Sequence, residues 1–359
     1  MKKTDFISKV NPLIILLIFI FILTGSGSII MIKLFSASSN LADNSLNKTV
    51  LAFSTYYSSN DVSSYNSLIK NKNFISEIAA DTYTADGNGN VSGLVPNNQI
   101  SYSNAHGINT YAMITNNFSS SIAKKILESK ANRDSLINNI LKAVEKNGYK
   151  GVNIDFENVY SYDRAYLTTF MNELYTLLHS NGYIVTISVP AKTDNDTKNE
   201  WYGAFDYKSL SNYCDELIIM AYDEHYQGGS PGPIASIGWV QNIIDYAITV
   251  IPRSKILIGI AAYGYDWSSK GTKAYGMDGI NTIASTYNAK IKFDATSKSP
   301  YFNYIDKNGI KHTVWFENST SLGYKLDLVN NYDLKGIAFW RLGLESSDFW
   351  NTINSRFKK

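Results

Sequence analysis

The chain has 359 residues, of which 44% are apolar and 18% are charged, and its formal net charge is +2. This composition indicates a folded protein, long enough for one large domain or two smaller ones. Lys and Arg form no stripe that would neutralise a phosphate backbone, so we expect no nucleic-acid partner.

The N-terminus has the organisation of a membrane anchor or an export signal. Lys2, Lys3 and Lys9 precede an apolar run from Leu13 to Leu23. Together with a second apolar patch, the stretch 12–35 reaches about the 20 residues that span a bilayer. Small residues after the apolar run are equally compatible with signal-peptide cleavage.

The basic residues come first, which predicts a cytoplasmic N-terminus and an extracytoplasmic remainder. We therefore expect three parts, namely an anchor or signal over residues 1–35, a tether over 36–48 and a catalytic domain over 49–355.

Metal and redox chemistry receive little support. Cys214 is the only cysteine, and the four histidines lack the spacing of metal ligands. We predict neither a metal nor a cofactor. No cation neighbours Cys214 in the sequence to lower its pKa, so we expect an inert buried thiol.

From Thr49 onward, short apolar runs alternate with amphipathic stretches. The runs are continuous rather than alternating, as in strands whose two sheet faces are both buried. Eight strands separated by helices predict an α/β fold, a (β/α)8 TIM barrel. The expected strands are Thr49–Tyr57, Ile75–Tyr83, Ile108–Thr115, Gly151–Phe156, Tyr183–Val189, Glu216–Tyr222, Ile256–Tyr263 and Gly336–Trp340, with helices over Ser119–Asn147, Asp163–Ser180 and Val240–Val250.

The segment between the seventh and eighth strands is longer than one crossover helix requires. Within it, Tyr301–Asp306 and Lys311–Glu317 flank a Lys-Asn-Gly turn and predict a hairpin. We expect a small inserted α+β subdomain over residues 268–317 that forms one wall of a cleft.

The fourth strand carries the clearest chemical pattern. Asn153, Asp155 and Glu157 occupy alternate positions and therefore face one side, here the barrel interior. Taken alone, this pattern also fits a strand that ends in solvent-facing acids. A second polar strand end at Met220-Ala-Tyr-Asp223 makes the combination more specific, because barrel active sites lie where strands end.

These motifs resemble glycoside hydrolase family 18, whose fourth strand carries DxxDxDxE with the Glu as general acid. Asp155 and Glu157 match the last two acids, whereas Asn153 replaces the middle Asp and Lys150 the first. Met220-Ala-Tyr-Asp223 matches the family's MxYD strand, and Trp340 matches the Trp that ends strand eight. The resemblance covers about residues 49–350.

The resemblance implies a retaining, substrate-assisted mechanism. Glu157 would be the proton donor, pushed toward a neutral pKa by Asp155, which would stabilise the reacting acetamide with Tyr222. Substrate would also contact the side chains at three further positions, Asn153, Asp223 and Trp340.

Within the family, Tyr222-Asp-Glu-His225 and Tyr263-Gly-Tyr-Asp-Trp267 are most similar to the spore-cortex and germination branch, which acts on peptidoglycan. The wall-binding LysM repeats usual in that branch are not found, and the apolar N-terminus is expected to localise the protein instead. We expect a monomer that binds N-acetylglucosamine-containing polysaccharide. Alternatives are a chitinase, a catalytically weak or inactive lectin-like barrel, for which Asn153 argues, and a membrane scaffold.

Overall fold

The computed structural model describes residues 46–358. The expected anchor or signal over 1–35, and most of the tether over 36–48, lie outside the described residues. Between Leu46 and Lys358, no helix is both long enough and apolar enough to cross a membrane.

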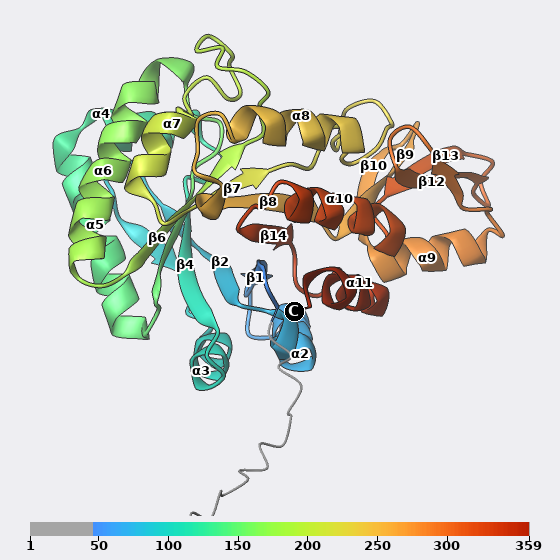
Figure 1. Ribbon diagram of the computed structural model, residues 1–359, viewed down its shortest axis with the longest axis horizontal. Coiled ribbons are helices and arrows are strands. Elements are labelled where there is room, and N and C mark those ends of the chain that lie inside the picture. Colours follow the sequence, from blue (N-terminus) through green and yellow to red (C-terminus); the bar gives the residue numbers. More distant parts are fainter. Residues whose placement is uncertain (1–45, 359) are drawn as a thin grey trace, which may run out of the picture. The chain divides into compact units, whose positions relative to one another are not determined.

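The core of the fold is a closed barrel of eight parallel strands (Figure 1). Pairing of the first strand with both the second and the last closes the sheet, and a short antiparallel strand, β3 (Val91–Gly93), extends it at β2. This confirms the predicted barrel. Its strands are β1 (Thr49–Thr55), β2 (Glu77–Ala85), β4 (Asn109–Thr115), β5 (Gly151–Asp155), β6 (Ile184–Pro190), β7 (Glu216–Met220), β8 (Ile256–Ala261) and β14 (Gly336–Trp340).

Apolar side chains cover both faces of these strands. A small cluster including Leu51, Tyr111 and Leu257 fills the barrel interior, while a much larger cluster packs between the strands and the outer helices. Burial on both sides explains why the strands are continuous apolar runs.

Helices connect the strands and cover the barrel. They are α2 (Ser63–Asn71), α3 (Asn97–Ala105), α4 (Ser120–Glu128), α5 (Lys130–Asn147), α6 (Arg164–Ser180), α7 (Tyr207–Leu210), α8 (Ile237–Ala247), α10 (Ser319–Asn331) and α11 (Ser347–Phe357). The single helix expected over Ser119–Asn147 is wrong. Ser129 adopts an extended conformation and its hydroxyl accepts from the Asn132 N–H, so it ends α4 and caps α5.

A second sheet lies in sequence between β8 and β14. Its five antiparallel strands, in the order β10-β9-β13-β12-β11, accompany helix α9 (Met277–Thr286). The sheet begins at Tyr263 rather than at the expected residue 268. Its strands are β9 (Tyr263–Ser268), β10 (Gly271–Gly276), β11 (Lys292–Asp294), β12 (Ser299–Ile305) and β13 (Lys311–Phe316), the last two forming the predicted hairpin.

Candidate active site

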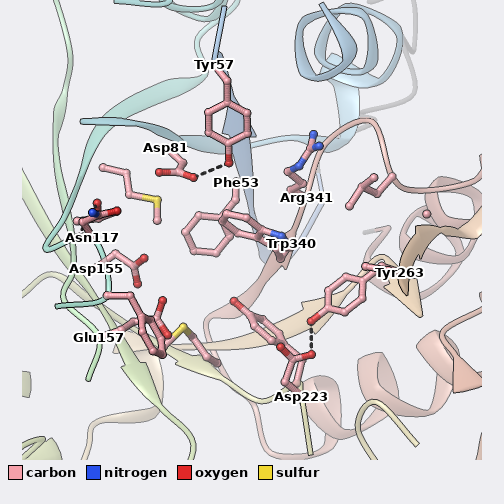
Figure 2. A pocket seen from close by; sticks show the side chains of 18 of the residues that line it. Phe53, Tyr57, Asp81, Asn117, Asp155, Glu157, Asp223, Tyr263, Trp340 and Arg341 are labelled. Atoms are coloured by element: carbon pink, nitrogen blue, oxygen red, sulfur yellow. Dashed lines mark hydrogen bonds between the residues drawn. The ribbon is translucent and has the colours of Figure 1, made fainter. Parts of the chain in front are cut away.

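A cavity of about 690 Å³ opens at the carboxyl ends of the barrel strands (Figure 2). That volume is in the range of small-molecule and cofactor sites. Residues of β9 and β10 line one side, so the inserted sheet supplies part of the wall. The polar lining includes four carboxyl groups, those of Asp81, Asp155, Glu157 and Asp223.

Asp155 and Glu157 lie at the end of β5, on the same side of the cavity (Figure 2). Burial raises the pKa of Asp155 well above its usual range, and the charges of Glu157 and Asp81 raise it further, opposed by a hydrogen bond with Ser188. Burial also raises the pKa of Glu157 to about 7, with contributions from Asp223 and Asp81. Glu157 is therefore suited to proton transfer near neutral pH. Burial, rather than the expected proximity of Asp155, is the main cause.

The backbone of Glu157 is held by a residue that the sequence analysis missed. Asn116, fully buried in the loop after β4, accepts a hydrogen bond from the Glu157 N–H at 2.9 Å and donates to the Glu157 carbonyl oxygen at 2.8 Å. Both peptide groups around the candidate acid are thereby fixed. The available signal was a polar residue directly after the third predicted strand.

Tyr222 and Asp223 follow β7 and line the cavity. Asp223 has a φ of 62°, in the left-handed region that Asp tolerates better than most residues. Its carboxylate accepts hydrogen bonds from the hydroxyls of Tyr263, at 2.5 Å, and Tyr265, at 3.1 Å, both from β9. Burial raises the pKa of Asp223 and these two hydrogen bonds lower it.

Glycine at position 259 makes room for the Tyr222 ring. A Cβ atom on Gly259 of β8 would come within 2.9 Å of Tyr222 Cε1 and 2.6 Å of the Ile219 carbonyl oxygen. A larger residue there would displace the ring or the strands. The absence of a Cβ atom at position 259 thus leaves the space in which the Tyr222 ring lies.

Trp340, at the end of β14, lines the cavity and packs against Phe53 with ring centroids 5.5 Å apart. Its position at a strand end agrees with the predicted substrate-binding role, which remains a proposal. Beside it, the Tyr57 hydroxyl donates to Asp81 at 3.0 Å, and Arg341 completes this end of the cavity (Figure 2). These three residues were not among the predicted site residues. Tyr57 and Arg341 lie just beyond strand ends, whereas Asp81 lies in the middle of β2, at a shift in its register with β4.

Asn153 does not line the cavity. Its side chain is fully buried in the barrel interior, where it donates to Thr186 Oγ1 at 2.9 Å and accepts from Ser188 Oγ at 3.2 Å. Ser188 also lowers the pKa of Asp155, opposing the effect of burial, so it lies close to that carboxyl group. Asn153 is therefore placed to act on the site through Ser188 rather than by touching substrate.

Two residues named in the sequence analysis, His225 and Cys214, do not line the cavity. The ring of His225 packs against Gly232, and its Nδ1 lies 3.1 Å from the Pro233 carbonyl oxygen. These contacts join the two ends of the loop that follows β7. Cys214 is buried, and burial raises its pKa to about 12, as expected for an inert thiol. Over residues 46–358, no cluster of three or more His, Cys, Asp or Glu side chains could hold a metal ion.

Known proteins are similar to this chain in sequence and in fold. Residues 39–345 match the family described as glycosyl hydrolases family 18. The chain is 33% identical over 311 residues to the uncharacterized glycosylase YvbX of Bacillus subtilis (strain 168), covering 84% of this chain and 90% of that protein. It is 34% identical over 247 residues to the cortical fragment-lytic enzyme of Bacillus anthracis, covering 67% of this chain and only 57% of that protein.

Two solved structures are similar in fold. The spore cortex-lytic enzyme SleL of Bacillus cereus has a TM-score of 0.82 at 29% identity, with 87% of this chain and 74% of that chain covered. A chitinase from Chromobacterium violaceum ATCC 12472 has a TM-score of 0.81 at 32% identity, with 87% and 99% covered.

Proposed function

The chain belongs to the glycosyl hydrolases of family 18 and is a glycoside hydrolase of the spore-cortex branch, and on that premise we propose that it cleaves β-1,4 bonds in peptidoglycan. The observation that carries the proposal is a half-buried Glu157 with a pKa near 7, beside Asp155 in the cleft. The similarity to cortical fragment-lytic enzymes supports spore cortex as the substrate. The similarity to a chitinase makes chitin the alternative substrate.

The first step is protonation of the glycosidic oxygen by Glu157. A carboxyl with a pKa of about 7 is largely protonated in mildly acidic to neutral solution and can still be regenerated after each turnover. Because Asn116 fixes both peptide groups of Glu157, the carboxyl approaches the bond from a defined direction. The bond from the anomeric carbon to that oxygen breaks as the proton transfers.

The nucleophile is the substrate's own 2-acetamido group. Its carbonyl oxygen attacks the anomeric carbon and gives an oxazolinium ion, which water opens with retention while Glu157 takes the proton back. Asp155 orients the acetamide N–H and stabilises the positive charge, and the Tyr222 hydroxyl donates to the acetamide oxygen. Both side chains line the same cavity as Glu157, which supports these roles.

Two further residues bind the sugar. We assign Trp340 as the apolar platform beneath the reacting ring, since aromatic faces pack well against the C–H faces of sugars. Asp223 accepts hydrogen bonds from Tyr263 and Tyr265, which leaves lone pairs for a sugar hydroxyl. Asn153 lies below the cavity, so we propose that it positions Asp155 through Ser188.

The proposed location is extracytoplasmic, with the N-terminal apolar segment as a membrane anchor or a cleaved signal. The basic residues before that segment support this orientation. We propose that the protein acts as a monomer.

The test is glycan-fragment release measured by mass spectrometry on spore cortex, vegetative peptidoglycan and chitin oligomers. The full-length chain should release products with reducing N-acetylglucosamine, and Glu157→Gln should release none while still binding. Release from chitin alone would identify a chitinase. If the unmodified chain binds these glycans but releases fragments from none of the three, the protein is a lectin-like barrel.

A further inference from the structure

Arg341 is the one basic side chain that lines the cavity within the described part of the chain. It follows β14 directly, next to the proposed platform Trp340. Figure 2 shows Arg341 and Tyr57 at one end of the cavity and Glu157 and Asp223 at the other. A cation therefore lies in the substrate cleft but away from the proposed proton donor.

Most of this guanidinium group is not used by the protein. One nitrogen, Nη1, donates to the Leu342 carbonyl oxygen at 3.0 Å and lies 3.5 Å from Ser63 Oγ. Among residues 46–358, no carboxylate comes within 4.0 Å of its nitrogens to form an ion pair. Asp81, which also lines the cavity, accepts from Tyr57 instead. Since Arg carries five N–H donors, several are free to bind a ligand.

The surrounding charge gives this cation a defined task. Four carboxyl groups line the same cavity, and each of them that ionises would repel an anionic substrate, so Arg341 is the one lining side chain that would attract it. Arg341 is also half-buried, where screening by solvent is weaker than at an open surface. A planar guanidinium matches the two oxygens of a carboxylate.

We propose that Arg341 binds a carboxylate carried by the glycan next to the reacting N-acetylglucosamine, and so selects peptidoglycan over chitin. Chitin is neutral at every sugar. In peptidoglycan every second sugar bears a lactyl group, which ends in a free carboxylate, continues into a peptide that has carboxylates of its own or, in spore cortex, closes into a neutral lactam that this contact would not recognise. The inference rests on the proposed function, because it names the feature of the substrate that this same cleft recognises.

The experiment compares the full-length chain with Arg341→Gln, Arg341→Lys and the control Lys142→Gln, which removes an exposed charge from α5. The substrates are N-acetylglucosamine oligomers, peptide-free glycan strands with free lactyl carboxylates, the same strands after methyl esterification, and peptide-bearing strands. Loss of a charge-assisted bidentate contact should lower kcat/KM on the carboxylate-bearing strands roughly 10- to 100-fold relative to the neutral oligomers.

The loss of kcat/KM should come from a higher KM and should be smaller at high salt. Arg341→Lys should restore part of kcat/KM, and Lys142→Gln should match the unmodified chain. On the peptide-free strands, esterification should lower the kcat/KM of the unmodified chain toward that of Arg341→Gln. If only the peptide-bearing strands discriminate the variants, the carboxylate is that of the peptide. An equal loss on all four substrates, or no loss on any, overturns the inference.

Binding separates this inference from the proposed function. Affinity for each glycan is measured for Glu157→Gln with and without Arg341→Gln. A chain that cleaves nothing refutes the proposed hydrolysis, yet weaker binding of carboxylate-bearing strands by the double variant would still support Arg341 as the selective residue. Equal binding by both variants would refute it.

Discussion

Asn116 holds the peptide groups on both sides of Glu157 with one side-chain amide, through hydrogen bonds of 2.8 and 2.9 Å. The two residues are 41 positions apart and come from neighbouring connections of the barrel. The candidate acid is therefore fixed by the loop after β4 rather than by its own strand alone.

Asn116→Ala should lower kcat by roughly 10- to 100-fold with little change in KM, because the misplaced acid acts in the transition state more than in binding. Steady-state kinetics on a soluble N-acetylglucosamine oligomer measure this. The control is Asn138→Ala on the exposed side of α5. A change confined to KM would show that Asn116 shapes the binding surface instead.

Gly259→Ala should displace the Tyr222 ring together with the end of β7 that carries it, since the new methyl group would lie 2.9 Å from Cε1 and 2.6 Å from the Ile219 carbonyl oxygen. We expect a folded protein with kcat reduced about tenfold or more, as a misplaced catalytic contact produces. Gly238 in the first turn of α8 has no atom within 4 Å of an added Cβ, so Gly238→Ala should keep full activity and remain folded. Equal activity of the two variants would exclude positioning by Gly259.

The barrel strands could be predicted because each is a short apolar run buried on both faces, from Thr49 to Trp340. The break at Ser129 was not predictable from periodicity, since apolar spacing continues on both sides of it. Only the extended backbone and the capping hydroxyl distinguish two helices from one.

The candidate site was predicted where a strand motif carried it, as at Asp155 and Glu157. Asn153 follows the same alternation but stays below the cavity, because the alternation fixes the face and not the depth along the barrel axis. Asn116 and Arg341 lie in connections that have no period, so their contacts depend on tertiary structure.

The pH dependence of cleavage should report the ionisation of Glu157. Its protonated form donates the proton, so kcat/KM should fall as pH rises through about 7. The charge of Asp81 raises the pKa of both Glu157 and Asp155. Asp81→Asn removes that repulsion, eases ionisation of Glu157 and should move the alkaline limb to lower pH, whereas the exposed Asp134→Asn should leave it in place. An unshifted limb in Asp81→Asn would contradict the coupling.

Glu77, at the start of β2, lies at the opposite end of the barrel from the cavity, facing Glu216 of β7. Burial and the neighbouring Glu216 carboxylate raise its pKa from 4.5 to about 8, although Lys335, which pairs with Glu216 at 2.5 Å, opposes this. The folded protein thus holds this proton more tightly than the unfolded chain does. Its stability should therefore decrease as pH rises from about 4.5 to about 8.

A glutamine at position 77 cannot ionise, so the stability of Glu77→Gln should decrease much less over this pH range. Above the raised pKa, Glu77→Gln should therefore be more stable than the unmodified chain. The gain is on the order of a few kcal/mol at most, since each pKa unit corresponds to about 1.4 kcal/mol. Thermal unfolding across this pH range, with the exposed Glu145→Gln as control, measures the difference in slope. Cleavage should persist, because the active ends of the strands are at the other end of the barrel. Parallel slopes for Glu77→Gln and the unmodified chain would mean that Glu77 is not the group that binds this proton.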